Sequence, residues 1–300
     1  MLDVVVIGSG PAGLSAAVYA KRANLNVVVI EKLYLGTGQV AESSRVDNYL
    51  GLPGINGFDL GDKFRRHAED LGVTFREGNA VNFAQENGVW KVSLEKGEGL
   101  ETKTVIYAAG AVHRHLGIDG EVELGGRGVS YCATCDGAFF RNKEVAVIGG
   151  GDTALDDALY LSDLCKKVYL VHRRDAFRGS AHTVERLSQK ENVEFVLNAR
   201  PSAITGEVRL EKLVLEGGRE LAVDGVFIAV GMVPMTDPVK DLVSLDSGGY
   251  IVADETGVTS APGFFVAGDV RTKMLRQVVT AVSDGANAAT SAEHFIRNGI

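Results

Sequence analysis

The 300-residue sequence predicts an α/β fold with two parallel-sheet domains of the same kind. The main observation is a β-α-β pattern that occurs twice, each time with a glycine-rich turn between the first strand and the helix. Its expected elements are strands at 4–7 and 27–30 around a helix at 12–22, and strands at 145–148 and 168–171 around a helix at 153–164. Units of this kind form parallel sheets, and the glycine turn is typical of dinucleotide binding. We therefore expect two Rossmann-like domains of the three-layer ββα type.

The two copies also run in register. Glu31 lies 23 positions after Gly8, and His172 lies 23 positions after Gly149. A further strand is repeated as well, because the apolar segments 105–110 and 226–231 both end in glycine. Self-similarity of this kind indicates two domains of one ancestry.

The charge balance argues against nucleic acid or a membrane surface as a partner. Lys and Arg number 31 against 39 Asp and Glu, a formal net charge of −8, so no overall field attracts phosphate backbones or anionic lipids. The longest uncharged run, 4–20, contains three glycines and a proline, and Asp3 precedes it where a signal peptide has basic residues. We therefore expect neither a membrane span nor a secretory signal, and a cytoplasmic location.

The first glycine turn follows a strand of buried character and opens a helix. Gly8 allows the tight turn, Gly10 lets a pyrophosphate approach the backbone, and Gly13 packs the helix on the strand. Glu31 ends the second strand, where an acid hydrogen-bonds a ribose hydroxyl. The alternative for Glu31 is a solvated loop carboxylate.

The second glycine turn, 149–154, ends on Ala154, and the strand after it ends in cations instead of an acid. His172, Arg173 and Arg174 stand there, with Arg178 four residues beyond Arg174. Guanidinium groups give a 2′-phosphate bidentate partners that a carboxylate would repel, so we expect NADPH rather than NADH. The alternative is a basic loop that faces solvent.

Two of the three cysteines form a Cys-X-X-Cys pair, Cys132 and Cys135, just before the second β-α-β unit. Zinc needs a further ligand pair at suitable spacing, and Cys165 stands alone inside an expected helix, so we expect no metal. A dithiol is the better interpretation, because one thiolate can attack a disulfide and the second thiol can resolve the mixed disulfide. Asp136 could move the proton. The alternatives are two buried structural cysteines and a turn aspartate.

A strand at 263–269 ends in Gly268 and Asp269, and an apolar helix expected at 276–289 follows it. Together with the two glycine turns, the cysteine pair and the arginine cluster, this order of motifs closely resembles the low-molecular-weight thioredoxin reductases. The resemblance covers nearly the whole chain. It implies an FAD-binding domain at 1–112 and 239–300, with an NADPH-binding domain that carries the dithiol inserted at 113–238.

The resemblance also implies roles for individual residues. Cys132, Cys135 and Asp136 would be catalytic, with Cys135 facing the flavin and Cys132 attacking the acceptor. The FAD-binding residues would be Gly8, Ser9, Gly10, Pro11, Ala12, Gly13, Glu31, Lys32, Gly38, Gln39, Asn48, Ala109, Gly110, Gly268, Asp269, Arg276, Gln277 and Val278. The NADPH-binding residues would be Gly149, Gly151, Asp152, Thr153, Ala154, His172, Arg173, Arg174 and Arg178. Arg127 would help to dock the partner.

The implied activity is NADPH-dependent thioredoxin-disulfide reduction (EC 1.8.1.9). NADPH gives hydride to the flavin, the flavin passes electrons to the Cys132–Cys135 disulfide, and the dithiol reduces thioredoxin or a thioredoxin-like protein. Members of the family are homodimers whose two domains swing about hinges, here expected near His113 and Pro238. Departures around the flavin, such as Thr37 and Leu275, keep open another electron donor, ferredoxin or a flavin, or another disulfide acceptor. A redox sensor without turnover is the alternative of a different class.

Overall fold

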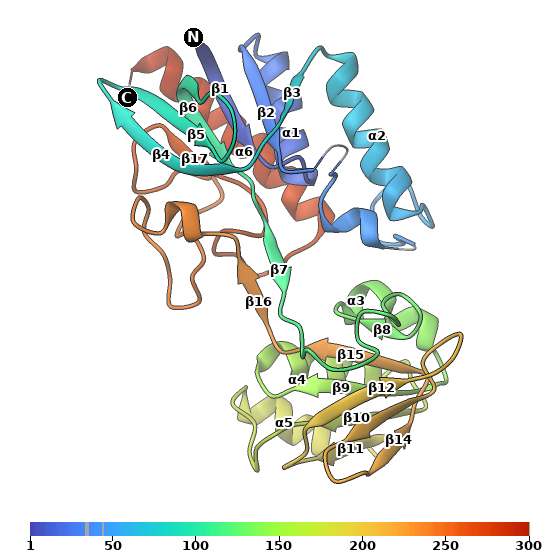
Figure 1. The fold of residues 1–300 in the computed structure, drawn as a ribbon. Helices are drawn as coiled ribbons and strands as arrows, with labels where there is room; N and C mark the ends of the chain where they lie inside the picture. Colours follow the sequence, from blue (N-terminus) through green and yellow to red (C-terminus); the bar gives the residue numbers. More distant parts are fainter. Residues whose placement is uncertain (34–35, 44, 300) are drawn as a thin grey trace. The chain divides into compact units, whose positions relative to one another are not determined.

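The structure, a computed structural model, describes residues 1–33, 36–43 and 45–299, and the chain forms two compact units. Unit 1 comprises Met1–Val112 together with the chain from Val233 onward, and unit 2 comprises His113–Met232 (Figure 1). The residues of unit 2 are therefore inserted between the two segments of unit 1.

The sheet of unit 1 combines a parallel part with an antiparallel hairpin. Its parallel strands are β1 (Leu2–Ile7), β2 (Val27–Glu31), β3 (Thr74–Glu77), β6 (Leu100–Tyr107) and β17 (Phe264–Val266). The hairpin strands β4 (Ala80–Glu86) and β5 (Val89–Leu94) continue the sheet from β6 in the order β3-β2-β1-β6-β5-β4. Residues 105–107 of β6 pair with β17, whereas its first residues, 100–102, pair with β5. The sheet therefore divides at β6, and the hairpin forms a separate layer.

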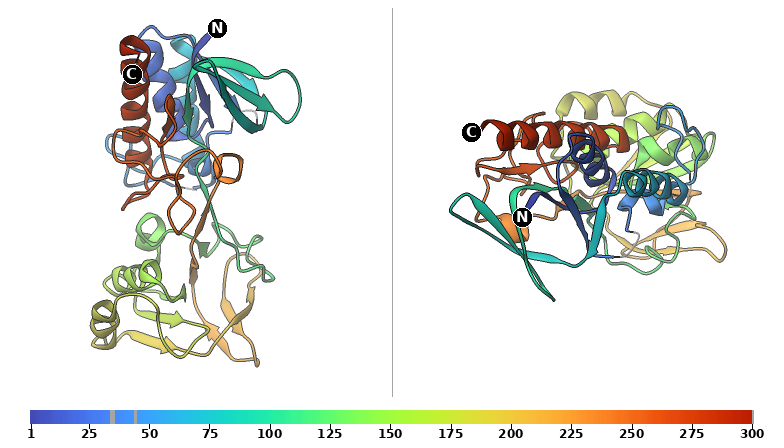
Figure 2. Two further views of the ribbon diagram at one scale, coloured as in Figure 1. Left: turned by 90° about the vertical axis from the view of Figure 1, so that its left-hand side faces the viewer. Right: turned by 90° about the horizontal axis from the view of Figure 1, so that it is seen from above.

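Helices cover the other face of the unit 1 sheet. The helices α1 (Pro11–Arg22) and α6 (Val278–Asn298) pack against each other on that face, and α2 (Gly57–Asp70) lies beside α1. The left view of Figure 2 shows α6 and the β4–β5 hairpin on opposite sides of the sheet. At the α1–α6 contact a Cβ on Gly285 would lie 2.1 Å from the Ala12 carbonyl oxygen, so only glycine permits this approach. The resulting order of layers is hairpin, sheet and helices.

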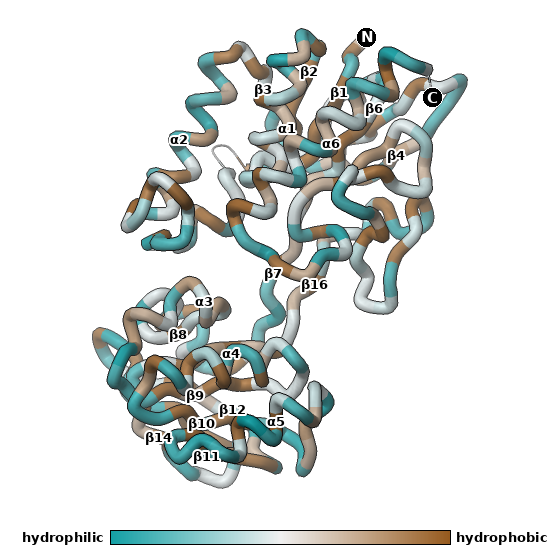
Figure 3. The backbone as a smooth tube through the Cα atoms, turned by 180° about the vertical axis from the view of Figure 1, so that it is seen from behind, coloured by the Kyte–Doolittle hydropathy of each residue, from teal (hydrophilic) through white to brown (hydrophobic). Residues whose placement is uncertain are grey.

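Unit 2 repeats this plan. Its parallel sheet has the order β11-β10-β9-β15-β8, formed by β8 (Val129–Ser130), β9 (Glu144–Gly149), β10 (Lys167–Val171), β11 (Val193–Val196) and β15 (Gly225–Ala229). One face packs on α4 (Asp152–Ser162) and α5 (Ala181–Ser188), and the other on the antiparallel strands β12 (Pro201–Thr205), β13 (Lys212–Leu215) and β14 (Glu220–Ala222). Hydrophobic residues line β9 and β10 (Figure 3). Both faces of the sheet are covered, as continuous apolar strands require.

The expected α/β fold with two Rossmann-like domains is confirmed, and the strands and helices of the two expected β-α-β units lie within two residues of the observed ones. The strand expected at 105–110 is β6 at 100–107, and the strand expected at 263–269 is β17 at 264–266. The last helix differs as well. That helix begins at Val278 instead of 276 and ends at Asn298 instead of 289. Gln277 is its N-cap, and its side chain and that of Thr280 form a capping box. Beyond Ala289 most residues are polar, so the sequence pattern did not indicate more helix. Ala292 and Phe295 nevertheless continue the apolar face of the helix and pack on the core of unit 1.

The second domain boundary lies six residues before the expected one, between Met232 and Val233 instead of 238 and 239. The connecting strands β7 (Ala111–His113) and β16 (Met232–Pro234) pair with each other. The chain after them is already bound to unit 1: the Met235 amide donates to the Gly110 carbonyl over 3.0 Å, and the Tyr107 hydroxyl donates to the Met235 carbonyl over 2.7 Å. These bonds join residues more than 120 positions apart in the chain, so the local sequence could not show that unit 1 resumes before Met235.

Three 3-10 segments, η1 (Gln39–Glu42), η2 (Gly137–Phe140) and η3 (Asp237–Val239), and the short helix α3 (Ala133–Asp136) complete the elements of the described residues. None of the helices in this part of the chain is long and apolar enough to cross a membrane. Within the same residues, no group of three or more His, Cys, Asp and Glu side chains could hold a metal ion.

Candidate active site

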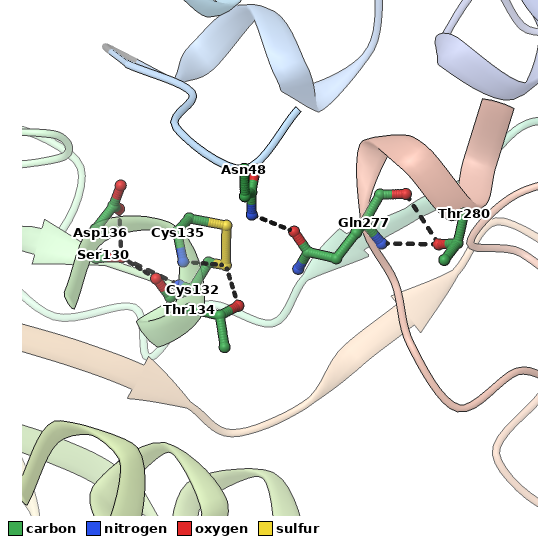
Figure 4. Close-up of a disulfide and its surroundings, with 8 residues drawn as sticks. All are labelled: Asn48, Ser130, Cys132, Thr134, Cys135, Asp136, Gln277 and Thr280. Carbon is green, nitrogen blue, oxygen red and sulfur yellow. Dashed lines mark hydrogen bonds between the residues drawn. A yellow bond between two sulfur atoms is a disulfide. The ribbon is translucent and has the colours of Figure 1, made fainter. Parts of the chain in front are cut away.

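The cysteine pair forms a disulfide in unit 2. Cys132 and Cys135 are bonded, with their Cα atoms 5.3 Å apart, and Cys132 is the N-cap of α3 (Figure 4). Cys132 Sγ accepts the Cys135 amide over 3.2 Å and lies 3.5 Å from the Thr134 hydroxyl. Both donors can stabilise a thiolate on Cys132. Cys165 is a buried free thiol whose pKa burial raises to about 11, as expected of a core residue.

The carboxyl group of Asp136 lies next to this disulfide in the chain and is mostly buried. Burial raises its pKa, and the bond from the Ser130 hydroxyl, 2.6 Å from Oδ2, opposes that rise (Figure 4). A carboxyl group with a raised pKa beside thiols is suited to accept and return protons near neutral pH. The sequence did not single out Ser130, since a serine at a strand end carries no distinctive pattern.

The residue before Cys132 belongs to a second polar cluster of unit 2. The Tyr131 hydroxyl donates to Glu121 over 2.8 Å, and its ring stacks on His113 with centroids 4.9 Å apart. The buried Glu121 also accepts the amides of Leu116 and Gly117 over 3.0 and 2.8 Å. The dithiol segment is therefore tied to the chain that enters unit 2 from β7.

In unit 1 the first glycine turn has the geometry that its sequence predicts. Gly8 has φ +103°, and a Cβ there would lie 2.5 Å from the Ala108 carbonyl oxygen. A Cβ on Gly13 would lie 1.9 Å from the Gly8 carbonyl oxygen, so the helix can approach the strand only with glycine. A Cβ on Gly10, in contrast, would lie no nearer than 3.8 Å to the atoms around it, which leaves the backbone at the start of α1 accessible to a ligand.

Neighbouring segments surround the start of α1. Pro11 and Ala12 begin the helix, and a Cβ on Gly268 would lie 2.8 Å from the Ala12 Cβ. On the other side a Cβ on Gly38 would lie 3.1 Å from the Gly10 Cα, and the Ser9 hydroxyl donates to the Gly36 carbonyl. The tertiary structure thus brings together three stretches that the sequence analysis assigned separately to FAD.

Glu31 ends β2 as expected, but it is not solvated. Its Oε2 lies 2.6 Å from Arg65 Nη1 of α2, and both side chains are buried. Arg65 also lies 2.7 Å from Glu69 and stacks over the Phe75 ring. Arg65 therefore holds Glu31 in place, a partner that no sequence motif indicated. Lys32, the next residue, is exposed.

Asp269 follows Gly268 and is partly buried, with its Oδ1 atom shielded from solvent. Its Oδ1 has no hydrogen-bond partner among the described residues, and burial raises its pKa. Nearby, the buried Asp284 of α6 accepts the Gly268 amide over 3.0 Å and pairs with Arg271 and Lys273 at 2.7 and 2.8 Å. A buried polar atom without a partner indicates a ligand that completes it.

The other expected FAD residues lie in unit 1 around the start of α6 and the end of β6. Asn48 donates to Gln277 over 2.9 Å (Figure 4), and the Arg276 guanidinium lies 4.1 Å from the centre of the Tyr250 ring. Gln39 donates to the Ala111 carbonyl over 2.7 Å. Val278 packs on the cluster of Val40, Val46 and Leu60, and Ala109 and Gly110 follow β6.

The second glycine turn matches the first at equivalent positions. A Cβ on Gly149 would lie 2.5 Å from the Ala229 carbonyl oxygen, as one on Gly8 would from Ala108, so the repeat is structural. No atom lies within 4 Å of a Cβ on Gly151, and Asp152, Thr153 and Ala154 begin α4 there. The backbone at the start of α4 is therefore accessible in the same way.

The arginine segment folds back onto this turn. The Arg178 amide donates to the Gly150 carbonyl over 2.7 Å, and Asp152 accepts the Ser180 amide over 2.7 Å. Arg173, Arg174 and Arg178 are exposed, and no carboxylate of the described residues forms an ion pair with them.

His172 differs from the arginines. It is only 6% exposed and stacks on Phe177, and a Cβ on Gly150 would lie 2.2 Å from its ring. Burial lowers its pKa, and Nε2 has no partner among the described residues. The ring therefore packs against the glycine turn. The three arginines, in contrast, are exposed to solvent.

Known proteins share this fold and much of this sequence. The family model of pyridine nucleotide-disulphide oxidoreductases matches residues 2–285. Thioredoxin reductases of Bacillus subtilis (strain 168) and Treponema pallidum (strain Nichols) are 41% and 43% identical over 300 residues, which cover 98% of this chain and 94% and 97% of those proteins. The solved thioredoxin reductase from Streptococcus pyogenes MGAS5005 gives a TM-score of 0.94 at 41% identity, with 99% of each chain covered.

The chain therefore belongs to the pyridine nucleotide-disulphide oxidoreductase family, a class of flavoprotein enzymes. Within this class its activity is that of the thioredoxin reductases, EC 1.8.1.9, with FAD and NADPH as cofactors. Both the family and the activity that the motifs led us to expect are therefore confirmed.

Proposed function

We propose that Cys132 and Cys135 are the redox pair of this reductase and that thioredoxin, or a thioredoxin-like small protein, is the acceptor. The observation that carries the proposal is the disulfide of unit 2 beside a carboxyl group, Asp136, whose pKa is raised by burial. A Cys-X-X-Cys disulfide beside a proton carrier is suited to dithiol exchange.

We assign FAD to unit 1 and NADPH to unit 2. The observations that favour FAD are the accessible backbone at Gly10 and the partnerless Oδ1 of Asp269, with Glu31 held by Arg65 for the adenosine ribose. When bound, FAD supplies a carrier that takes hydride from NADPH and returns two electrons to the disulfide. The remaining FAD-binding residues are those that the resemblance implies.

In unit 2 the accessible backbone at Gly151 suits the pyrophosphate of NADPH. Arg173, Arg174 and Arg178 offer unpaired guanidiniums for its 2′-phosphate. We propose that the buried His172 ring packs against Gly150 and so positions the glycine turn, and that it does not contact the phosphate directly.

The protons and electrons of the dithiol step are all supplied by the chain and taken up by its acceptor. The Cys132 thiol passes its proton to Asp136, and the thiolate attacks the acceptor disulfide, whose departing sulfur takes that proton. Cys135 then passes its proton to Asp136 and attacks Cys132 Sγ, which restores the disulfide and releases the second acceptor sulfur. That sulfur takes the proton from Asp136 and leaves as a thiol. Two electrons and two protons thus pass from the dithiol to the acceptor. We also propose a homodimer in the cytoplasm, on the resemblance alone.

Anaerobic titration tests the donor and the acceptor separately. NADPH should bleach the flavin band in the wild type and in a Cys135→Ser variant, and only the wild type should then reduce thioredoxin. Bleaching by neither NADPH nor NADH would point to ferredoxin or a free flavin as donor. Thioredoxin reduction by Cys135→Ser at the wild-type rate would contradict the assigned redox pair.

A further inference from the structure

Ser130 lies between the attacking cysteine and the proposed proton carrier. It ends β8, two residues before Cys132, and is 5% exposed. Its hydroxyl donates to Asp136 Oδ2 over 2.6 Å, and its oxygen accepts the Cys132 amide over 3.1 Å (Figure 4). One buried side chain thus connects the Asp136 carboxyl group to the Cys132 backbone.

We propose that Ser130 is a positioning residue of the dithiol step, which holds the Asp136 carboxyl group against the Cys132 segment in both of its protonation states. The inference rests on the function proposed above, in which Asp136 accepts and returns each proton. Every contact on which it rests joins protein atoms within unit 2.

A hydroxyl group can serve both states because it carries one donor and two acceptor positions. While Asp136 is charged, the Ser130 proton points to Oδ2. Once Asp136 is protonated, the serine oxygen can accept the carboxylic proton and turn its own proton to the Cys132 carbonyl, which lies 3.4 Å away. The amide of Cys132 donates to the same oxygen in both arrangements. The carboxyl group therefore changes charge without losing its anchor.

The proposal predicts a direction for the pH dependence. Burial raises the pKa of Asp136, and the Ser130 bond lowers it, so removal of the hydroxyl should raise the pKa further. Other titratable groups lie on the elements packed against α3: Tyr160 of α4 contacts Gly137, Asp157 stands one turn before it, and Arg141 follows η2. Burial and the adjacent Asp156 raise the pKa of Asp157 to about 7. The experiment must therefore separate Asp136 from Asp157.

The test follows the reaction of the reduced holoenzyme with oxidised thioredoxin as a function of pH in stopped flow. Asp136→Asn should abolish the acid limb that Asp136 causes, which separates it from Asp157. Ser130→Ala should move that limb upward by about one pH unit, because the hydroxyl bonds the charged carboxylate more strongly than the neutral acid. Ser130→Thr should restore it. Ser202→Ala, which removes a hydroxyl bonded to the Val214 carbonyl elsewhere in unit 2, should leave it unchanged.

The outcomes distinguish the proposed role of Ser130 from the proposed role of Asp136. An acid limb that Asp136→Asn removes but Ser130→Ala leaves in place would overturn the role of Ser130 while leaving that of Asp136. An acid limb that keeps its wild-type position and size in Asp136→Asn would overturn the proposed proton transfer, and the role of Ser130 with it. If Ser130→Ala does not fold, Ser130→Gly takes its place, and the wild-type limb in Ser130→Gly would equally contradict the inference.

Discussion

Consecutive residues before the dithiol point to different polar partners. Ser130 contacts Asp136, and the next residue, Tyr131, contacts Glu121. Burial alone would raise the pKa of Glu121, but the bonds from Leu116, Tyr131 and Gly117 bring it below its ordinary value. Glu121 therefore stays charged as an anchor, whereas the pKa of Asp136 is raised. The different numbers of donors around two buried carboxyl groups account for the different roles.

The exposed arginine cluster of unit 2 should determine whether the enzyme prefers NADPH or NADH. Replacing Arg173 and Arg174 together by Ala should raise the KM for NADPH about 100-fold, the equivalent of two charge-assisted hydrogen bonds of roughly 1.5 kcal/mol each. The KM for NADH should change little, because NADH carries no 2′-phosphate. Steady-state kinetics with both nucleotides measure the effect, and Arg200→Ala, an exposed arginine of unit 2, is the control. Equal changes for NADPH and NADH would mean that the pair only faces solvent.

Among the elements, α6 does more than cover the sheet of unit 1. Through Gly285 it approaches α1 closely, and through Asp284 it binds the loop that follows β17. Asp284 receives the Gly268 amide and the side chains of Arg271 and Lys273, all buried. The helix therefore holds the loop that carries Asp269, and beyond Ala289 its residues Ala292 and Phe295 pack on the core of unit 1.

We predict that Asp284→Asn destabilises unit 1 by about 3 kcal/mol at neutral pH, because it leaves two buried cations without their carboxylate. Burial opposes ionisation of Asp284, but bonds to Arg271 and Lys273 lower its pKa. The stabilisation should therefore be complete above the unfolded pKa of about 3.9 and disappear as the pH falls through the lower, folded value. Thermal unfolding across pH, together with FAD retained on gel filtration, measures it. Glu293→Gln, in an ion pair of α6 whose arginine, Arg297, is exposed, should cost less than about 1 kcal/mol. An equal loss in both variants would contradict the prediction.

For the whole molecule, the insertion of unit 2 within unit 1 means that two connections, β7 and β16, join them. A single flavin face cannot serve nicotinamide and disulfide at once, so we expect motion at these connections. We expect the second hinge near Met232, because Met235 and Val239 are already bonded to or packed on the rest of unit 1.

Fixing the connections should separate the two half-reactions. A Val112→Cys, Met232→Cys double variant joined by a short thioether cross-linker should keep either flavin reduction by NADPH or electron passage to the disulfide, and lose turnover. The same variant without cross-linker is the control. The native pair is protected as a disulfide, and Cys165 is buried. Unimpaired turnover after complete cross-linking would refute the need for motion.

The local sequence was sufficient for the two β-α-β units, the glycine turns, the dithiol and the family. These depend on apolar periodicity and on glycines at fixed offsets, which neighbouring residues determine. The position of the second boundary and the end of α6 were not predictable in this way, because bonds and packing between distant segments decide them.

For the site, the sequence by itself determined which residue types are present, and the tertiary structure decided which of them can act. Arg65 beside Glu31, Asp284 beneath Gly268 and Ser130 against Asp136 carry no motif. His172 stands next to two arginines in the chain and yet is buried. The physical reason is that hydrogen bonding and burial of a side chain depend on segments far away in the chain, whereas a motif records only its neighbours.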